Sequence, residues 1–377
     1  MGCGKSIADI AETCRDQFPV TQKLIWLHHA GVSPLCLPAA EAMKNLATDA
    51  VEWASFHYNL WLEEYESTRL SAAKLINASA REIAIVKNTS EGICTVQLGI
   101  SWKPGDRVVA FREEFPANYY PWKRLEQRGV QVEWLSIYDD LGTIDRACRG
   151  ARLLAISFVN YLSGHRVDLA AIGEICRRHG TFFLVDAIQG LGVFPIDVEA
   201  MHIDALASDG HKWLMGPEGC GILYVRRDRQ DEIEPVEFGW TTVAGYQDYD
   251  SRDMTVRPDA GRYECGSLNT IGIYGLRAAI DFVLTAGVDR IGPQVLALAG
   301  RLADGARSKG YELLRPITPQ NGAGIVSFRK GGIEIQGVVN RLKDERMIGA
   351  VRQGWIRLSP HFYQTLDEMD AVVSALP

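Results

Sequence analysis

The chain has 377 residues, of which 47% are hydrophobic and 23% charged, a globular composition that excludes collagen-like, disordered and disulfide-scaffold proteins. Its 47 acidic residues outnumber its 40 Lys and Arg residues, and the net charge of −7 disfavours a nucleic-acid partner because it repels a phosphate backbone. No apolar run reaches the roughly 20 residues of a membrane helix and no signal-peptide pattern opens the chain, so we expect a cytoplasmic protein without a membrane partner.

The eight cysteines and eight histidines show no metal-binding spacing. No CxxC pair occurs, so we expect mostly reduced thiols and no metal site. His28 and His29 are adjacent, but neighbouring side chains of a strand point to opposite faces, so the two cannot chelate one ion together.

Residues 2–6, Gly-Cys-Gly-Lys-Ser, resemble the end of a phosphate-binding loop. Such a loop needs a preceding strand to hold its amides toward the ligand, and none precedes it here, so this interpretation is disfavoured. The same residues fit the acylation pattern Met-Gly-x-x-x-Ser, with Cys3 as a second lipid site. A short polar leader is the favoured interpretation, and acylation stays open.

Between about residues 81 and 225, short β-rich runs alternate with helical patterns. The predicted strands are 83–86, 107–110, 132–137, 153–159, 181–185, 203–207 and 220–225, and the predicted helices are 90–100, 117–128 and 168–179. This alternation predicts right-handed crossovers and an α/β fold with a mainly parallel central sheet covered by helices.

A loop-rich stretch at 231–262 follows, then one long helix at 270–286. Short strands at 324–328 and 355–359 indicate a smaller α+β C-terminal domain. We therefore predict an N-terminal segment at 1–20, a large α/β domain at 21–268 and a small domain at 269–377.

Ligands of open α/β sheets bind beyond the carboxyl ends of the strands, so polar residues just after strands are the first candidates for a site. Asp186 follows the strand 181–185, where a buried carboxylate is costly unless a cation or hydrogen-bond donors meet it. A helix N-cap is the alternative interpretation for this residue. Gln189 offers an amide on the same side.

Residues 88–92, Asn-Thr-Ser-Glu-Gly, follow another predicted strand and open a helix. Hydroxyls, free amides and the positive helix end suit a phosphate, although a plain capping sequence explains the same residues. Phe115, Asn118 and Asn160 follow two further strands, so several polar strand ends converge on one edge of the sheet.

The sharpest local signal is Ser-Asp-Gly-His-Lys-Trp at residues 208–213. A partly buried lysine has a lowered pKa and becomes a nucleophilic amine, the form needed for a Schiff base, and Lys212 is the candidate. The glycines that follow lead into a strand instead of out of one, which argues against a dinucleotide-binding fingerprint.

These motifs resemble the class V aminotransferase family of fold-type I pyridoxal phosphate enzymes, which includes cysteine desulfurases and isopenicillin N epimerase-like proteins. The resemblance runs from Trp-Leu-His-His-Ala-Gly at 26–31 to Ile-Arg-Leu-Ser-Pro-His-Phe-Tyr at 356–363, with Asp186-x-x-Gln189 and Gly-His-Lys in the family order. It implies the fold-type I architecture, pyridoxal 5′-phosphate as cofactor and a small amino-acid substrate.

The resemblance also implies residue roles. Lys212 bears the cofactor and Asp186 pairs with the pyridinium nitrogen. Further cofactor contacts are implied for Gln189 and Asn160 near the phenolic oxygen, Thr89, Ser90, Ser208 and His211 near the phosphate, and Phe115 stacked on the ring. Relatives often carry Ser three residues before the lysine, where this chain has Asp209, so whether Ser208 or Asp209 faces the phosphate is open.

In relatives a turn from the neighbouring subunit completes the phosphate site, and Ser267 matches it, which implies a homodimer with active sites at the interface. His29 and Arg357 are implied to bind the substrate. A forked guanidinium suits a carboxylate, although a surface arginine on an edge strand is the alternative interpretation of Arg357.

Cysteine desulfurases carry a nucleophilic cysteine on a loop ahead of this arginine, whereas residues 350–357 contain neither a cysteine nor room for the loop. We therefore expect an enzyme that acts at the Cα atom of an amino acid, with transamination as first choice. Epimerisation and C–S or C–Se β-elimination are alternatives, and a non-catalytic cofactor-binding or acylated membrane-associated protein is a distant one.

Overall fold

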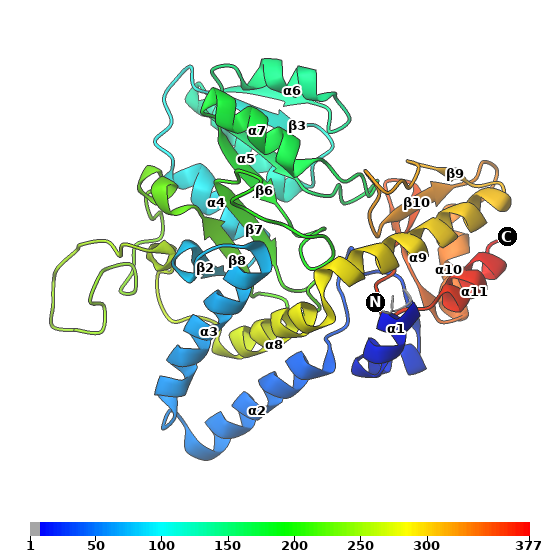
Figure 1. The fold of residues 1–377 in the computed structure, drawn as a ribbon, viewed down its shortest axis with the longest axis horizontal. Coiled ribbons are helices and arrows are strands. Elements are labelled where there is room, and N and C mark those ends of the chain that lie inside the picture. Colours follow the sequence, from blue (N-terminus) through cyan, green and yellow to red (C-terminus); the bar gives the residue numbers. More distant parts are fainter. Residues whose placement is uncertain (1–7) are drawn as a thin grey trace, which may run out of the picture.

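The computed structural model describes residues 8–377, so the motif at 2–6 and its acylation alternative lie outside the described residues. Figure 1 shows a large α/β part around a central sheet and a smaller part at the other end of the long helix α9 (Val288–Ser308).

The central sheet has seven strands in the order β2-β8-β7-β6-β5-β3-β4. Its strands are β2 (Ile83–Val86), β3 (Arg107–Phe111), β4 (Gln131–Leu135), β5 (Leu153–Ser157), β6 (Phe182–Asp186), β7 (Ala205–Asp209) and β8 (Gly221–Val225). Only β8 runs antiparallel to its neighbours, because the connection from β7 holds no helix that could return the chain for parallel pairing. The predicted mainly parallel sheet is confirmed.

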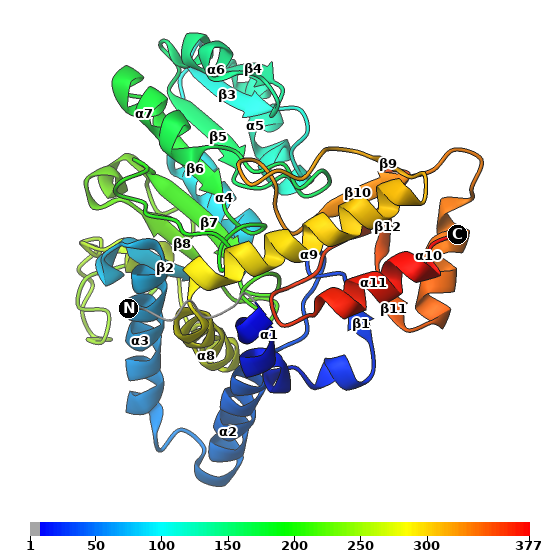
Figure 2. The same cartoon turned by 45° about the vertical axis from the view of Figure 1, so that its right-hand side comes forward.

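Helices cover both faces of this sheet (Figures 1 and 2). Side chains of α4 (Thr89–Gly99) and α5 (Tyr120–Leu125) pack on one face, and those of α6 (Leu141–Cys148), α7 (Leu169–His179) and α8 (Thr270–Ala286) pack on the other. Every residue of β2 and of β5 to β8 is buried, as strands covered on two sides require. The ends of the strands are therefore where polar side chains can gather.

The predicted helix at 117–128 is interrupted. A 3-10 turn at Pro116–Asn118 precedes α5, and a second 3-10 turn at Glu126–Arg128 follows it. Pro121 stands in the first turn of α5, where its missing N–H costs nothing, but it could not occupy the interior of one continuous helix.

The smaller part holds a four-stranded antiparallel sheet in the order β12-β13-β10-β9. Its strands are β9 (Glu312–Leu313), β10 (Val326–Arg329), β12 (Ala350–Arg352) and β13 (Trp355–Leu358), with α10 (Ile335–Asp344) and α11 (Leu366–Ala375) beside them. Figure 2 shows α9 running from the central sheet to this small sheet. The predicted α+β character of this part is confirmed.

The chain's first strand lies with the C-terminal part. β1 (Ile25–Trp26) pairs in parallel with β11 (Met347–Ile348), and Leu27 belongs to the same core cluster as α9 and α11. A pairing between segments so far apart in the sequence leaves no local pattern from which it could be predicted. The predicted domain boundaries at 20/21 and 268/269 stay predictions.

Three further helices, α1 (Ala8–Cys14), α2 (Leu37–Trp53) and α3 (Tyr58–Ile76), complete the α-helical elements of residues 8–377. In that range no single helix has the length and apolarity to cross a bilayer. α8 and α9 satisfy the same criterion only when taken together, and they are bent by 83° where they meet.

Candidate active site

A cavity of about 380 Å³ lies where the carboxyl ends of β2, β3, β5, β6 and β7 meet the small domain. The structure brings eight of the predicted site residues to its wall, namely Thr89, Ser90, Phe115, Asp186, Gln189, His211, Lys212 and Arg357. His28, Tyr161, Asp209 and Arg352 line it as well. The convergence expected at this edge of the sheet is therefore observed.

Lys212 lies in the tight connection between β7 and β8. Ser33 Oγ and the Met215 N–H both donate to its carbonyl oxygen, which holds the backbone of the turn. The Nζ atom stands 5.6 Å from the centroid of the Phe115 ring. Burial lowers the pKa of Lys212 to about 8, an effect that the negative charge of Asp186 partly offsets. A substantial share of neutral amine is therefore present near pH 8.

Asp186 ends β6 and is 3% exposed. Its Oδ1 accepts a hydrogen bond of 3.1 Å from the Ile188 N–H. Burial raises the pKa of this carboxyl to about 6, and it forms no ion pair within residues 8–377. A buried carboxylate without a cation partner fits the protonated ring nitrogen of the implied cofactor.

Gln189 has a fixed orientation. Its Oε1 accepts from Trp213 Nε1 at 2.8 Å, and its Nε2 donates to the Ala30 carbonyl oxygen at 3.0 Å. One proton of Nε2 is left for a ligand in the cavity, since an amide nitrogen carries two donors. This agrees with the implied contact to an oxygen of the cofactor, which stays a prediction.

The N-terminus of α4 forms the anion-binding end of the cavity. The Asn88 side chain caps the helix by accepting from the Glu91 N–H at 2.9 Å, and Thr89 Oγ1 accepts from the Asp209 N–H at 2.9 Å. Backbone amides at a helix N-terminus attract negative groups, so a phosphate fits here. Plain helix capping explains the Asn88 contact but not the position of Thr89 and Ser90 in the cavity wall.

Ser208 and Asp209 take different positions relative to the cavity. Both belong to β7, in which alternate side chains face opposite ways, and Asp209 is the one that lines the cavity. Ser208 Oγ instead donates to the Asp209 carbonyl oxygen at 3.2 Å. Oδ2 of Asp209 lies 3.0 Å from His211 Nδ1. A phosphate contact by Ser208 stays a prediction that this placement does not favour.

Asn160 does not line the cavity. Its Oδ1 accepts from the backbone N–H groups of Leu162 and Ser163, and its Nδ2 donates to the Glu113 carbonyl oxygen at 2.7 Å. These bonds shape the loop after β5, which carries Tyr161 to the cavity wall. The predicted contact to the phenolic oxygen stays a prediction, and in this structure Asn160 acts on the loop.

The assignment of His29 to substrate binding stays a prediction that its placement does not favour. His29 is fully buried, and its ring contacts the Ser359 carbonyl oxygen and the Tyr363 hydroxyl, both at 2.7 Å. A carbonyl only accepts, so Nδ1 carries the proton and Nε2 accepts from Tyr363. The neighbouring His28 lines the cavity instead. The two adjacent side chains point in opposite directions, and the sequence alone did not say which one points inward.

Arg357 is 2% exposed, and its Nη1 donates to the Tyr161 carbonyl oxygen at 2.7 Å. Its Nε has no hydrogen-bond partner. Burial lowers the pKa of this guanidinium to about 10, and the charge of Arg352 lowers it further. A buried guanidinium without a carboxylate among residues 8–377 fits an anionic ligand, which favours the substrate-binding interpretation over a surface arginine.

Glu114 is a buried acid close to Asp186 that the sequence analysis missed. It is 6% exposed, accepts from the Ser157 N–H at 2.6 Å and is hydrogen-bonded to the Ser157 hydroxyl. Burial raises the pKa of Glu114 to about 8, and the charge of Asp186 raises it as well. The available signal was its position just after β3, the same signal that pointed to Phe115.

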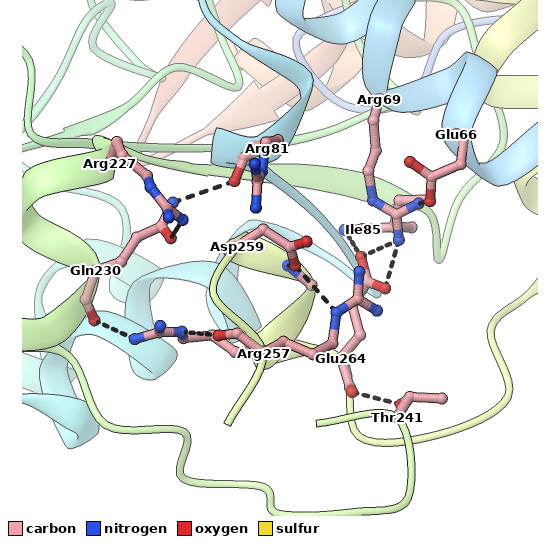
Figure 3. Close-up of polar contacts among 12 residues, drawn as sticks. Glu66, Arg69, Arg81, Ile85, Arg227, Gln230, Thr241, Arg257, Asp259 and Glu264 are labelled. Carbon is pink, nitrogen blue, oxygen red and sulfur yellow. Dashed lines mark hydrogen bonds and ion pairs between the residues drawn. The ribbon is translucent and has the colours of Figure 1, made fainter. Parts of the chain in front are cut away.

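Ser267 lies away from this cavity and lines a separate one of about 600 Å³. Figure 3 shows what fixes Glu264, three residues before Ser267: its carboxylate accepts from Arg69 at 2.5 and 2.7 Å and from the Ile85 N–H at 2.8 Å. Its carbonyl oxygen accepts from Thr241 at 2.5 Å. The turn that carries Ser267 is therefore held in place within the chain, but it does not reach the cavity of Lys212 in the same chain.

Comparison with known proteins places these features in a family. The family model described as Aminotransferase class-V matches residues 25–369. The chain is similar to probable cysteine desulfurases of Pyrococcus abyssi, at 30% identity, and of Methanothermobacter thermautotrophicus, at 32%, with 97% of each chain covered in both cases. The solved apo structure of a cysteine desulfurase from Thermococcus onnurineus NA1 superposes with a TM-score of 0.88 at 27% identity, covering 96% of both chains.

Proposed function

Because this chain belongs to the class V aminotransferase family of pyridoxal phosphate-dependent enzymes, we propose that it transfers the amino group of a small amino acid by chemistry at the Cα atom. The predicted family, the fold-type I architecture, the assignment as an enzyme and the cofactor are confirmed. When bound, pyridoxal 5′-phosphate supplies an aldehyde that condenses with amines and an electron-poor ring that stabilises a carbanion.

The observation that carries the proposal is the gathering of Lys212, Asp186 and Arg357 around one cavity. Arg357 holds the α-carboxylate of the substrate, because its buried guanidinium has no other anion to meet. Lys212, with a pKa of about 8, accepts the proton from Cα as a neutral amine and can return it to a neighbouring atom. Asp186 stays ionised above about pH 6 and holds the proton on the ring nitrogen.

Two features separate this chemistry from that of a cysteine desulfurase. β12 and β13 are joined by the two-residue turn Gln353-Gly354, whose φ angles of 47° and 79° are those of a tight hairpin turn. No cysteine follows Cys265 in the sequence, and Cys265 itself is exposed, with its thiol donating to Glu237 at 3.3 Å. Since no cysteine of residues 8–377 lines the cavity around Lys212, persulfide formation on the enzyme is disfavoured.

β-Elimination from a sulfur amino acid is the second candidate, because the similar proteins are named cysteine desulfurases and elimination needs no enzyme cysteine. Epimerisation uses the same Lys212 and stays an alternative. His28 does not serve as the acid that protonates a leaving group, since burial and the charge of Arg357 lower its pKa to about 4 and keep it unprotonated. This favours transamination over elimination.

We also propose a homodimer in which Ser267 of one protomer completes the phosphate site of its partner. The support is the rigid mounting of the turn at Glu264 together with its distance from the cavity in its own chain. Light scattering of the purified protein gives the oligomeric state. A monomer with full cofactor affinity contradicts this arrangement.

The function is tested by incubating the holoenzyme with a panel of L-amino acids and measuring keto acid, ammonia, sulfide and inverted amino acid. Transamination predicts keto acid without ammonia and conversion of the cofactor to its amine form. Ammonia released together with sulfide or pyruvate supports elimination instead, and inverted amino acid supports epimerisation. Borohydride reduction followed by peptide mapping should attach the cofactor to Lys212, and attachment to another lysine contradicts the site assignment.

A further inference from the structure

A second arginine of the β12–β13 hairpin reaches the same cavity. In this antiparallel pair Ala350 stands opposite Arg357 and Arg352 stands opposite Trp355. Residues two apart on one strand share a face, so Arg352 and Arg357 are diagonal neighbours on the face that looks toward the cavity. Both side chains line it, Arg357 deep in the wall and Arg352 at the exposed mouth.

The charge of Arg352 acts on the groups inside. It lowers the pKa values of Arg357, His28 and Lys212, three groups on different elements that all border the cavity. The side chain itself makes one hydrogen bond, of 3.0 Å, to the carbonyl oxygen of Val351. In the described part of the chain it forms no ion pair. Its guanidinium is thus aimed at the cavity with nothing negative to meet there.

The hairpin that carries this charge is fixed in place. Gln353 Nε2 donates to the Tyr161 hydroxyl at 2.7 Å, and the Tyr161 carbonyl oxygen accepts from Arg357. The turn of the hairpin and its strand β13 are therefore tied to the loop after β5. A cation on a fixed element is preorganised for a ligand, because little side-chain and loop freedom is lost when the ligand binds.

None of the anions assigned to this cavity lies beside Arg352, and the cofactor phosphate is assigned to the N-terminus of α4. Asp186 is matched by the protonated ring nitrogen, and Asp209 lies beside His211. Arg357 is matched by the α-carboxylate of the substrate. No carboxylate of the cavity wall pairs with Arg352, so its guanidinium is available for a carboxylate of the ligand.

We propose that Arg352 binds a carboxylate on the substrate side chain, so that the substrate class is the small dicarboxylic α-amino acids such as aspartate and glutamate. This inference rests on the proposed function, because it takes Arg357 as the partner of the α-carboxylate. His28 adds a neutral polar group on the same wall, and its Nδ1 is buried without a hydrogen-bond partner. The apolar rings of Phe115 and Tyr161, packed edge to face at 5.2 Å, form another part of the wall.

The test uses ligands that lack an amino group and therefore cannot react. Dissociation constants of succinate and glutarate, and of the matched monocarboxylates butyrate and valerate, are measured on the holoenzyme by titration calorimetry at one ionic strength. A charge-assisted contact predicts that the wild type binds the dicarboxylates about tenfold more tightly than the monocarboxylates. In Arg352→Gln this preference should vanish while monocarboxylate affinity stays within about twofold. Arg352→Lys, which keeps the charge, should restore part of the preference.

Arg341→Gln is the matched control, since it removes one positive charge from an exposed residue of α10 that pairs with Glu345 and does not line the cavity. It should keep the wild-type preference. Equal affinity of the wild type for both ligand classes overturns the proposal, and that measurement needs no variant. An equal weakening of both classes in Arg352→Gln also overturns it, because Arg352 would then act on the shared carboxylate.

The proposal and the proposed function fail differently. Keto acid formation at Lys212 without dicarboxylate preference leaves transamination standing and removes the role of Arg352. Dicarboxylate preference without labelling of Lys212 or any Cα chemistry leaves the binding site standing and removes the transaminase.

Discussion

Glu114 offers a test in which the direction of a pH effect is fixed by the structure. Its carboxyl is hydrogen-bonded to Ser157, the residue paired with Asp186 across β5 and β6. Burial raises the pKa of Glu114 from 4.5 to about 8, so the folded protein keeps a proton that the unfolded chain releases. Between about pH 4.5 and pH 8 the free energy of unfolding must therefore fall as the pH rises, because folding is linked to proton uptake.

The magnitude follows from the width of this window. One proton corresponds to about 1.4 kcal/mol per pH unit, and integration between pH 5.5 and 7.5 gives a loss of about 2.5 kcal/mol from this group. Glu114→Gln removes the titration and retains the shape, because the amide accepts from the Ser157 N–H and donates to its hydroxyl as the protonated acid does. Relative to wild type, the variant should therefore gain about 2.5 kcal/mol between these two pH values.

The assay is urea denaturation of cofactor-loaded wild type and Glu114→Gln at both pH values. The difference between the two proteins at each pH cancels the contribution of every titrating group that they share. Glu113→Gln is the matched control, since Glu113 is adjacent and its carboxylate accepts from Ser136 and the Ile137 N–H, both at 3.0 Å. A difference between Glu114→Gln and wild type that does not change with pH refutes the reasoning. So does a gain of the same size in the control.

Three further predictions concern the site itself. Asp186→Ala should retain some cofactor but suppress deuterium exchange at the substrate Cα, because the unprotonated ring is a weaker electron sink, and undiminished exchange contradicts its role. Asp209→Ser should tighten cofactor binding about tenfold in a fluorescence titration, since it removes a negative charge from the phosphate end of the cavity, and weaker binding counts against that placement. Cys265→Ser should leave steady-state turnover within about twofold, whereas a loss of sulfur release with fold and cofactor intact would revive the desulfurase interpretation.

Much of the site could be predicted because it follows one rule of α/β architecture. Asp186 ends a buried strand, and Thr89, Phe115 and Lys212 follow buried strands. A parallel sheet brings all such positions to one edge. Apolar strands and the polar residues that follow them are local features of the sequence. No long-range information was needed to group these residues, and the resemblance to a family then supplied their roles.

Other residues depended on directions that a sequence does not contain. β7 ends two residues beyond the predicted strand 203–207, so Ser208 and Asp209 alternate across a strand that was not predicted to include them. His28 and His29 alternate in the same way, and the inward one is fixed only by contacts of His29 with Ser359 and Tyr363 more than 300 residues later. Burial of Glu114 likewise depends on Ser157 of the neighbouring strand β5.

The hairpin at Gln353-Gly354 joins substrate recognition to the reactivity of the catalytic amine. Arg352 and Arg357 both lower the pKa of Lys212, so these cations keep the amine in its neutral, nucleophilic form at lower pH than burial alone would. In the proposed function, substrate carboxylates pair with the two arginines. This offsets the effect of the arginines and raises the pKa of Lys212 again. Before the cofactor is attached, the two arginines therefore favour the neutral amine that condenses with its aldehyde. Once the substrate amine has displaced Lys212, the paired carboxylates let the freed amine hold the proton taken from Cα more firmly.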